Sequence, residues 1–154
     1  TSFMMALTTF VSQNRGAREF DRARKGARFG LTCSVSLAEI IGLLIALFAA
    51  PLMRLFANDP QVIQYGVERA HYATILFFLL AYSHGVSAVL RGVGKSIIPM
   101  VVMLVCWCFV RVTLLTALNM MFHNIVFVYM IYPFTWSLSS VVFFLYYRKI
   151  NWQE

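Results

Sequence analysis

The sequence predicts an all-α protein, a polytopic transmembrane helix bundle with four full spans and the end of a fifth. Of its 154 residues, 60% are hydrophobic and only 12% are charged, whereas soluble domains are about 25% charged. Three long stretches are almost free of charge. The 25 residues between Arg28 and Arg54 carry one charge, the 21 between Arg69 and Arg91 carry none, and the 52 between Lys95 and Arg148 carry one. A helix needs about 20 apolar residues to cross a membrane. Barrel strands would alternate polar and apolar residues instead.

The first element is a partial span, residues 1–14, which is too short to cross. The chain has no initiator Met there, and no basic segment precedes the apolar stretch as in a signal peptide. We therefore expect a fragment that opens inside a helix. The complete spans are expected at residues 29–56, 71–90, 97–119 and 125–147. The polar residues Asn119, His123 and Asn124 mark the turn between the last two spans.

Positive charge is concentrated on one side of this topology. Residues 15–28 contain six Lys or Arg, residues 91–95 contain two and the tail contains two, whereas residues 54–69 on the other side contain two. Cytoplasmic loops carry the excess of Lys and Arg, which predicts a cytoplasmic C-terminus in a cell membrane, the bacterial inner membrane. Topology and contact with lipid headgroups then explain the net charge of +7, and no nucleic-acid partner is expected.

The sequence contains no constellation for catalysis or metal binding. Its three cysteines lie in apolar spans, and Cys106 and Cys108 would lie about 200° apart around a helix, too far to chelate one ion. His71 and His84 would be about 20 Å apart along a helix. The motifs HExxH, GxSxG, CxxC and the glycine-rich phosphate loop are missing. We expect no enzyme, no metal site and no cofactor.

Glu39 and Arg111 are the charges expected inside the hydrocarbon region. Glu39 would lie about 15 Å from the cytoplasmic end of its helix, on a face with several small residues that favours a bundle interior. There it could carry a proton or make an interhelical contact. Arg111 would lie about 21 Å deep, where its charge costs about 2.5–3.5 kcal/mol. We hypothesise a structural ion pair between the two, with substrate binding as the alternative role for Arg111.

Two segments carry a family resemblance. The segment TFVSQNRGA, residues 9–17, includes Gln13 and Asn14 and resembles the F-V-x-Q-N-x-G-A segment of multidrug and toxic compound extrusion (MATE) transporters. The segment VLRGVGKSIIP, residues 89–99, resembles the family's loop L-R-G-x-G-x-S-x-x-P. Its matching residues, which suit a tight turn followed by a helix, are Arg91, Gly92, Gly94 and Pro99. Residues 106–111 and 132–137 also look like bacterial members, so the resemblance covers essentially the whole chain.

The resemblance implies the end of helix eight through helix twelve of a transporter with two six-helix lobes. It further implies small cationic or amphipathic substrates, Na⁺ or H⁺ as the coupling ion, and the missing N-terminal lobe of the same chain as partner. Many members carry an acidic residue in the tenth helix. The corresponding span, 71–90, has none. The candidates for a substrate or ion pathway are Glu39, Arg111, His84, Gln13 and Asn14.

Three alternative functions fit the same sequence features. The first is a flippase for lipids or lipid-linked oligosaccharides, which belongs to the same superfamily. The second is a non-transporting membrane subunit whose spans only assemble with partners. The third is a complete small exporter that uses Glu39 as its proton site. Seven more spans upstream would support the transporter interpretation, and a start codon just upstream would favour the small exporter or the subunit.

Overall fold

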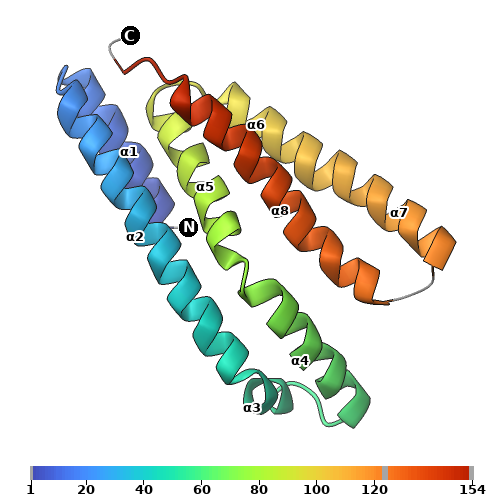
Figure 1. The fold of residues 1–154 in the computed structure, drawn as a ribbon. Helices are drawn as coiled ribbons and strands as arrows, with labels where there is room; N and C mark the ends of the chain where they lie inside the picture. Colours follow the sequence, from blue (N-terminus) through green and yellow to red (C-terminus); the bar gives the residue numbers. More distant parts are fainter. Residues whose placement is uncertain (1, 123–124, 153–154) are drawn as a thin grey trace.

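The computed structural model describes residues 2–122 and 125–152, and these residues form helices joined by short links (Figure 1). No strand occurs among them, which confirms the all-α prediction. The elements are α1 (Ser2–Gly16), α2 (Phe20–Leu47), α3 (Ala49–Arg54), α4 (Pro60–Thr74), α5 (Phe77–Gly92), α6 (Ile97–Met103), the π-helix η1 (Leu104–Val110), α7 (Arg111–Phe122) and α8 (Ile125–Arg148).

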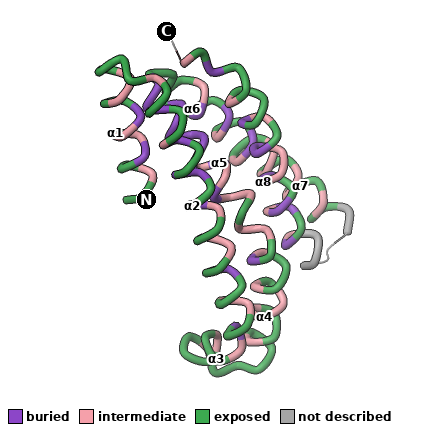
Figure 2. Tube along the Cα trace, turned by 60° about the vertical axis from the view of Figure 1, so that its left-hand side comes forward, coloured by how far each residue is buried: buried purple, intermediate pink, exposed green. Residues whose placement is uncertain are grey.

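Three helices are long and apolar enough to cross a membrane. They span Phe20–Leu47, Ile97–Met120 and Val128–Arg148, and the bent pair α4–α5 would make a fourth crossing. The predicted turn at His123 and Asn124 lies outside the described residues. Many large apolar side chains are exposed, with Leu47 75% and Phe109 66% exposed. Figure 2 colours the exposed residues green. Apolar exposure on this scale requires lipid contact, so the chain is a multi-pass membrane protein.

The basic segment at residues 15–28 is mostly helical, so its interpretation as a loop is wrong. Only residues 17–19 link α1 to α2, and Arg18 turns the chain with a positive φ of 60°. Its backbone N–H donates to the Arg15 carbonyl at 3.0 Å. Arg and Lys are good helix formers, and a helix end that protrudes into water keeps their charges solvated. Helix α2 therefore begins nine residues before the expected span at residue 29.

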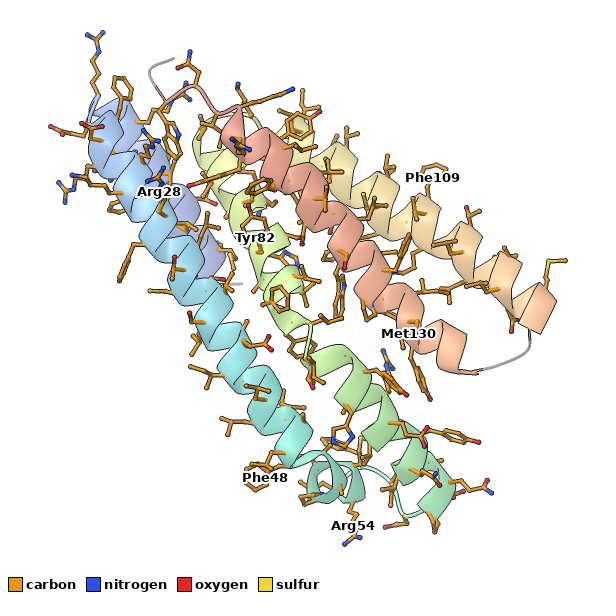
Figure 3. The ribbon with its side chains drawn as sticks, viewed as in Figure 1. Arg28, Phe48, Arg54, Tyr82, Phe109 and Met130 are labelled. Carbon is orange, nitrogen blue, oxygen red and sulfur yellow. The ribbon has the colours of Figure 1, made fainter. Side chains whose placement is uncertain are left out.

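Helix α2 gives way to α3 at Phe48, near the lower end of the bundle in Figure 3. Pro51 follows three residues later, and its ring would clash with the carbonyl four residues before it in a continuous helix. The chain then reverses into α4. Asp59 caps that helix by accepting the Gln61 backbone N–H at 2.8 Å, and Pro60 occupies the first helical position, where a missing N–H costs nothing.

The segment expected as one span at residues 71–90 is a broken helix. Helix α4 begins upstream at Pro60, and α5 follows it after a bend of 55° at residues 75–76. Figure 1 shows the break where the green ribbon changes direction. The α5 helix then runs to Gly92, and a left-handed Gly94 with φ of 82° turns the chain. Helix α6 begins at Ile97 with Pro99 in its first turn, as predicted.

The core lies where α1, α2, α5 and α8 meet. Gly92 lets α1 and α5 approach closely, because a side chain there would begin 2.8 Å from the Thr8 carbonyl oxygen. The Thr8 hydroxyl in turn donates to the Ala88 carbonyl at 3.0 Å. Small residues at helix contacts are the usual means of packing in membranes. The fully buried side chains around these contacts are Val11, Val86, Val89 and Phe143.

Candidate functional site

Glu39 lies on the half-buried face of α2 that meets the break between α4 and α5. Its carboxylate oxygen Oε2 accepts the backbone N–H of Phe78 at 3.1 Å. Phe78 is the second residue of α5, so this N–H is one of the donors that a helix start leaves without an internal partner. The positive end of the helix dipole also favours a carboxylate there. Glu39 therefore acts as a cap supplied by a neighbouring helix.

Arg111 lies at the junction of η1 and α7 and faces α8. Its Nη2 donates to the Thr135 hydroxyl at 2.8 Å. The guanidinium carbon lies 4.7 Å from the ring centroid of Tyr132 and 5.5 Å from that of Trp107, which are cation–π distances. Its Nε is buried without a hydrogen-bond partner. The charge is thus held by aromatic faces and a hydroxyl.

The expected ion pair between Glu39 and Arg111 is not formed. Each residue has other partners, Phe78 for the carboxylate and Thr135 for the guanidinium. They also lie at different interfaces, because Glu39 faces α5 and Arg111 faces α8. Within residues 2–122 and 125–152, neither takes part in an ion pair. Spacing along the chain predicts how deep each residue lies in its helix but not which neighbouring helix it faces.

His84 belongs to a polar network that joins α5, η1 and α8. Its ring meets Trp107 edge-on with 5.1 Å between centroids, and the Trp107 indole N–H donates to the Ser139 hydroxyl at 3.2 Å. Ser83 contacts the Ser139 and Ser140 hydroxyls at 3.0 and 2.9 Å. These serines are buried. Sequence reasoning missed them, although hydroxyls inside apolar spans indicate interhelical hydrogen bonds.

An aromatic cavity of about 470 Å³ lies beside the helix break, between α2, α3, α4, α5 and α8. Trp136 lines it, with the Phe77 ring at 6.0 Å and the Tyr132 ring at 6.4 Å between centroids, both edge-on. Arg69 also lines the cavity and places its guanidinium carbon 5.3 Å from the Tyr132 centroid. Tyr132 is thus contacted by two guanidiniums, those of Arg69 and Arg111.

A second cavity of about 770 Å³ lies between α1, α2 and α5. Phe77 and Leu80 line both cavities, so the start of α5 is the wall between them. His84 also lines the second cavity, together with the flexible side chains of Met4 and Met5. Both cavities therefore meet at the helix break that Glu39 caps.

The remaining predicted residues lie at the end of the bundle that carries the basic segment. Gln13 is exposed, and the Asn14 amide nitrogen donates to the Phe10 carbonyl of its own helix at 2.7 Å. Neither lines one of the two cavities. Arg15, which the motif analysis did not single out, donates to the Val93 carbonyl and holds the turn before Gly94. Arg91 is exposed and lines the second cavity.

No group of three metal-ligating side chains occurs in the described part of the chain. Cys33, Cys106 and Cys108 are free thiols. Cys106 and Cys108 lie on the π-helix η1, a rare helix type that is frequent at functional sites. The side chains that the structure gathers here carry aromatic, hydroxyl and guanidinium groups.

Comparison with known proteins gives one family. The family model described as MatE matches residues 1–118. A probable multidrug resistance protein NorM from Thermotoga maritima is 30% identical over 98 residues, which cover 64% of this chain and 21% of the relative. The NorM of Aromatoleum aromaticum is 31% identical over 67% of this chain and 22% of the relative. The probable multidrug resistance protein YoeA from Bacillus subtilis is 25% identical over 99% of this chain and 33% of the relative.

Proposed function

Since this chain belongs to the MatE family, we propose that it is part of a multidrug efflux transporter. It acts in an antiporter that exports cationic or amphipathic toxic compounds in exchange for Na⁺ or H⁺. The chain spans about a fifth to a third of the length of the curated relatives it matches. Export then requires a further lobe packed against this one. The observation that carries the proposal is the aromatic cavity at a broken helix.

Broken helices form the substrate sites of many secondary transporters, because their free helix ends can meet polar groups within the membrane. Here the break at residues 75–76 borders two cavities. Their volumes, about 470 and 770 Å³, match those of sites for drug-sized molecules. Aromatic edges and methionine side chains adapt to varied apolar ligands, which supports a broad range of amphipathic substrates.

The coupling ion requires a carboxylate, or another titratable group, that a proton or Na⁺ can reach. Glu39 is half-buried next to the break, and we propose it as the coupling group of this lobe, unless a carboxylate of the further lobe takes that role. Among the described residues that line the aromatic cavity, only Arg69 is charged, and its charge is positive. A cationic substrate therefore finds its counter-charge elsewhere, at Glu39 or in the further lobe.

The experiment compares drug efflux by two matched variants of the full-length protein in a bacterial strain that lacks its own efflux pumps. Trp136→Leu keeps an apolar side chain but removes the aromatic face from the cavity. Phe109→Leu is the control, because Phe109 is 66% exposed on the outer surface, where Figure 3 shows it pointing away from the bundle. Both variants are compared at equal abundance in the membrane.

We expect Trp136→Leu to reduce efflux of an aromatic drug about twofold to tenfold, since an aromatic contact contributes about 0.5–1.5 kcal/mol. The control should export normally. Wild-type efflux by both variants would mean that the aromatic cavity does not bind substrate. The ion is identified separately in inverted vesicles, where either a Na⁺ gradient or a pH gradient alone should drive drug uptake.

A further inference from the structure

Three arginines converge on a cavity at the end of the bundle that holds the chain's C-terminal segment. Arg24 and Arg28 lie one turn apart on α2, and Arg148 ends α8. Together they line a cavity of about 440 Å³, which the C-terminal segment also borders. Figure 3 labels Arg28 near this end of α2. We call this space the tail cavity.

Among the described residues, the tail cavity is lined by positive charge and by no carboxylate. None of its three guanidiniums forms an ion pair with the residues that the structure describes, and all the charged side chains that line it are arginines. Arg148 has its guanidinium carbon 5.7 Å from the Phe144 ring centroid, which offsets part of one charge. Three like charges around one space repel each other, and an anion between them removes that repulsion.

Tyr147 provides a second, independent sign of a missing acceptor. Its hydroxyl is buried in the tail cavity, beside Arg28, whose guanidinium can donate to the hydroxyl oxygen, and near Arg24. No described residue accepts the hydroxyl proton. A guanidinium can only donate hydrogen bonds, so neither arginine can accept the Tyr147 proton. A ligand oxygen would accept that proton and bonds from the guanidiniums at the same time.

The tail cavity lies where the apolar part of the bundle ends. The candidate span of α8 stops at Arg148, and the apolar stretch of α2 starts directly after Arg28. Trp152 contacts Tyr147 edge-on with 6.4 Å between centroids, and Trp with Tyr is the usual pair at the membrane–water boundary. This is the depth of phospholipid phosphates, and basic pockets between helices bind anionic headgroups.

We propose that the tail cavity binds a phosphate group, which Arg24, Arg28 and Arg148 hold by charged hydrogen bonds and to which Tyr147 donates. An anionic phospholipid headgroup supplies this phosphate. Occupancy ties the start of α2 to the end of α8 and to the C-terminal segment. A free phosphate ion has the same chemistry, and the experiment below separates the two sources. This inference does not depend on the proposed export activity.

The test measures lipid binding to the purified full-length protein in neutral detergent, from the rise in its thermal unfolding temperature as lipid is added. The probes are phosphatidylglycerol, phosphatidylcholine and inorganic phosphate. We expect phosphatidylglycerol to stabilise the protein in a saturable manner and phosphatidylcholine to have no comparable effect. Saturable stabilisation by inorganic phosphate alone would assign the site to a free anion and would overturn the lipid as its source.

The variants distinguish a built site from general positive charge. Arg28→Gln and Arg148→Gln should each weaken phosphatidylglycerol binding at least about tenfold, which corresponds to about 1.4 kcal/mol, the lower end for the loss of one hydrogen bond to a charged group. Arg22→Gln is the matched control, because Arg22 is exposed on the same helix and lies outside the cavity. Tyr147→Phe removes only the hydroxyl and should weaken binding without unfolding the protein. The proposal would be overturned if Arg22→Gln weakened phosphatidylglycerol binding as much as Arg28→Gln does. It would also be overturned if the single variants Tyr147→Phe and Arg28→Gln both bound the lipid as the wild type does.

Discussion

At the scale of single residues, Glu39 and Arg111 show two ways of keeping a charge in an apolar helix. Glu39 accepts the Phe78 backbone N–H at 3.1 Å, so its charge meets the positive end of a helix. Arg111 donates to Thr135 and lies over the Tyr132 and Trp107 rings. The Glu39 carboxylate is therefore stabilised by a backbone N–H, and the Arg111 guanidinium by aromatic rings and a hydroxyl. The two side chains do not stabilise each other.

The capping role of Glu39 predicts a graded response to substitution. Glu39→Ala removes the acceptor for the Phe78 N–H and should lower the free energy of unfolding by about 1 kcal/mol. Glu39→Gln keeps a neutral acceptor oxygen and should cost less. Unfolding in detergent is the measurement, and equal losses in both variants would contradict the cap. A Gln variant that is stable but does not export would identify Glu39 as the coupling group.

The separate partners of the two charges predict that their effects add. In a double-mutant cycle with Glu39→Gln and Arg111→Met, the stability losses should sum to within about 0.5 kcal/mol, because the residues share no partner. Arg111→Met should be the more harmful variant, since it leaves the buried Thr135 hydroxyl with one bond fewer. The cycle is measured as free energies of unfolding. A coupling energy above about 1 kcal/mol would mean that the charges do interact.

At the scale of elements, the break between α4 and α5 depends on α2. Gly42 is buried on α2, and a side chain added there would begin 2.7 Å from the Thr74 carbonyl oxygen and 3.2 Å from the Phe77 ring. Glu39 lies almost one turn before Gly42 and bonds to Phe78. Helix α2 thus contacts both sides of the break. Gly42 lies against the last residue of α4, and Gly42 and Glu39 both lie against the start of α5.

This close contact predicts that Gly42→Ala destabilises the protein despite the higher helix propensity of Ala. The added methyl group would push the Thr74 backbone away, and overpacking of this kind costs about 1–3 kcal/mol. Gly16→Ala is the control, because nothing lies within 4 Å of the Cβ that it would add. Thermal unfolding compares the two variants. A Gly42→Ala protein as stable as the control would show that the break tolerates a wider gap.

The same elements show how far the sequence could specify the fold. Apolar length alone placed the spans at 97–119 and 125–147 within about three residues of the helices, α6–η1–α7 and α8. Asp59 followed by Pro60 is a local signal for the start of α4, and it places that start eleven residues before the expected span at residue 71. The bend at residues 75–76 has no Gly or Pro, so it depends on tertiary contacts, which α2 and α8 both make with α4 and α5.

The candidate site was less predictable than the spans, for a related reason. Arg111 and Trp107 lie four residues apart in one span, so helical periodicity alone predicts that they are neighbours. Tyr132 and Thr135 lie on α8, and their approach to Arg111 depends on how α8 is rotated. Helical periodicity predicts which residues share a face of one helix, but it does not predict which face packs against a neighbouring helix. The serines between α5 and α8 were missed for the same reason.

At the scale of the whole molecule, the basic segments gather at one end. The link from α1 to α2, the turn from α5 to α6 and the C-terminal segment lie together at the top of Figure 1, whereas α3 and the start of α4 lie at the bottom. The first group contains ten Lys or Arg in residues 15–28, 91–95 and 148–149, and residues 54–69 contain two. We propose that the top faces the cytoplasm.

This orientation predicts the labelling of single cysteines in intact cells. Cys33, Cys106 and Cys108 are the native thiols, so each is first replaced by Ser or Ala in the full-length protein. A cysteine at Ala17, in the basic link, should resist a membrane-impermeant thiol reagent. A cysteine at Asn58, which is exposed between α3 and α4, should react. After the membrane is permeabilised, both positions should react, which controls for local accessibility. Reaction at residue 17 and protection at residue 58 in intact cells would reverse the orientation, and the cytoplasmic C-terminus would be wrong with it.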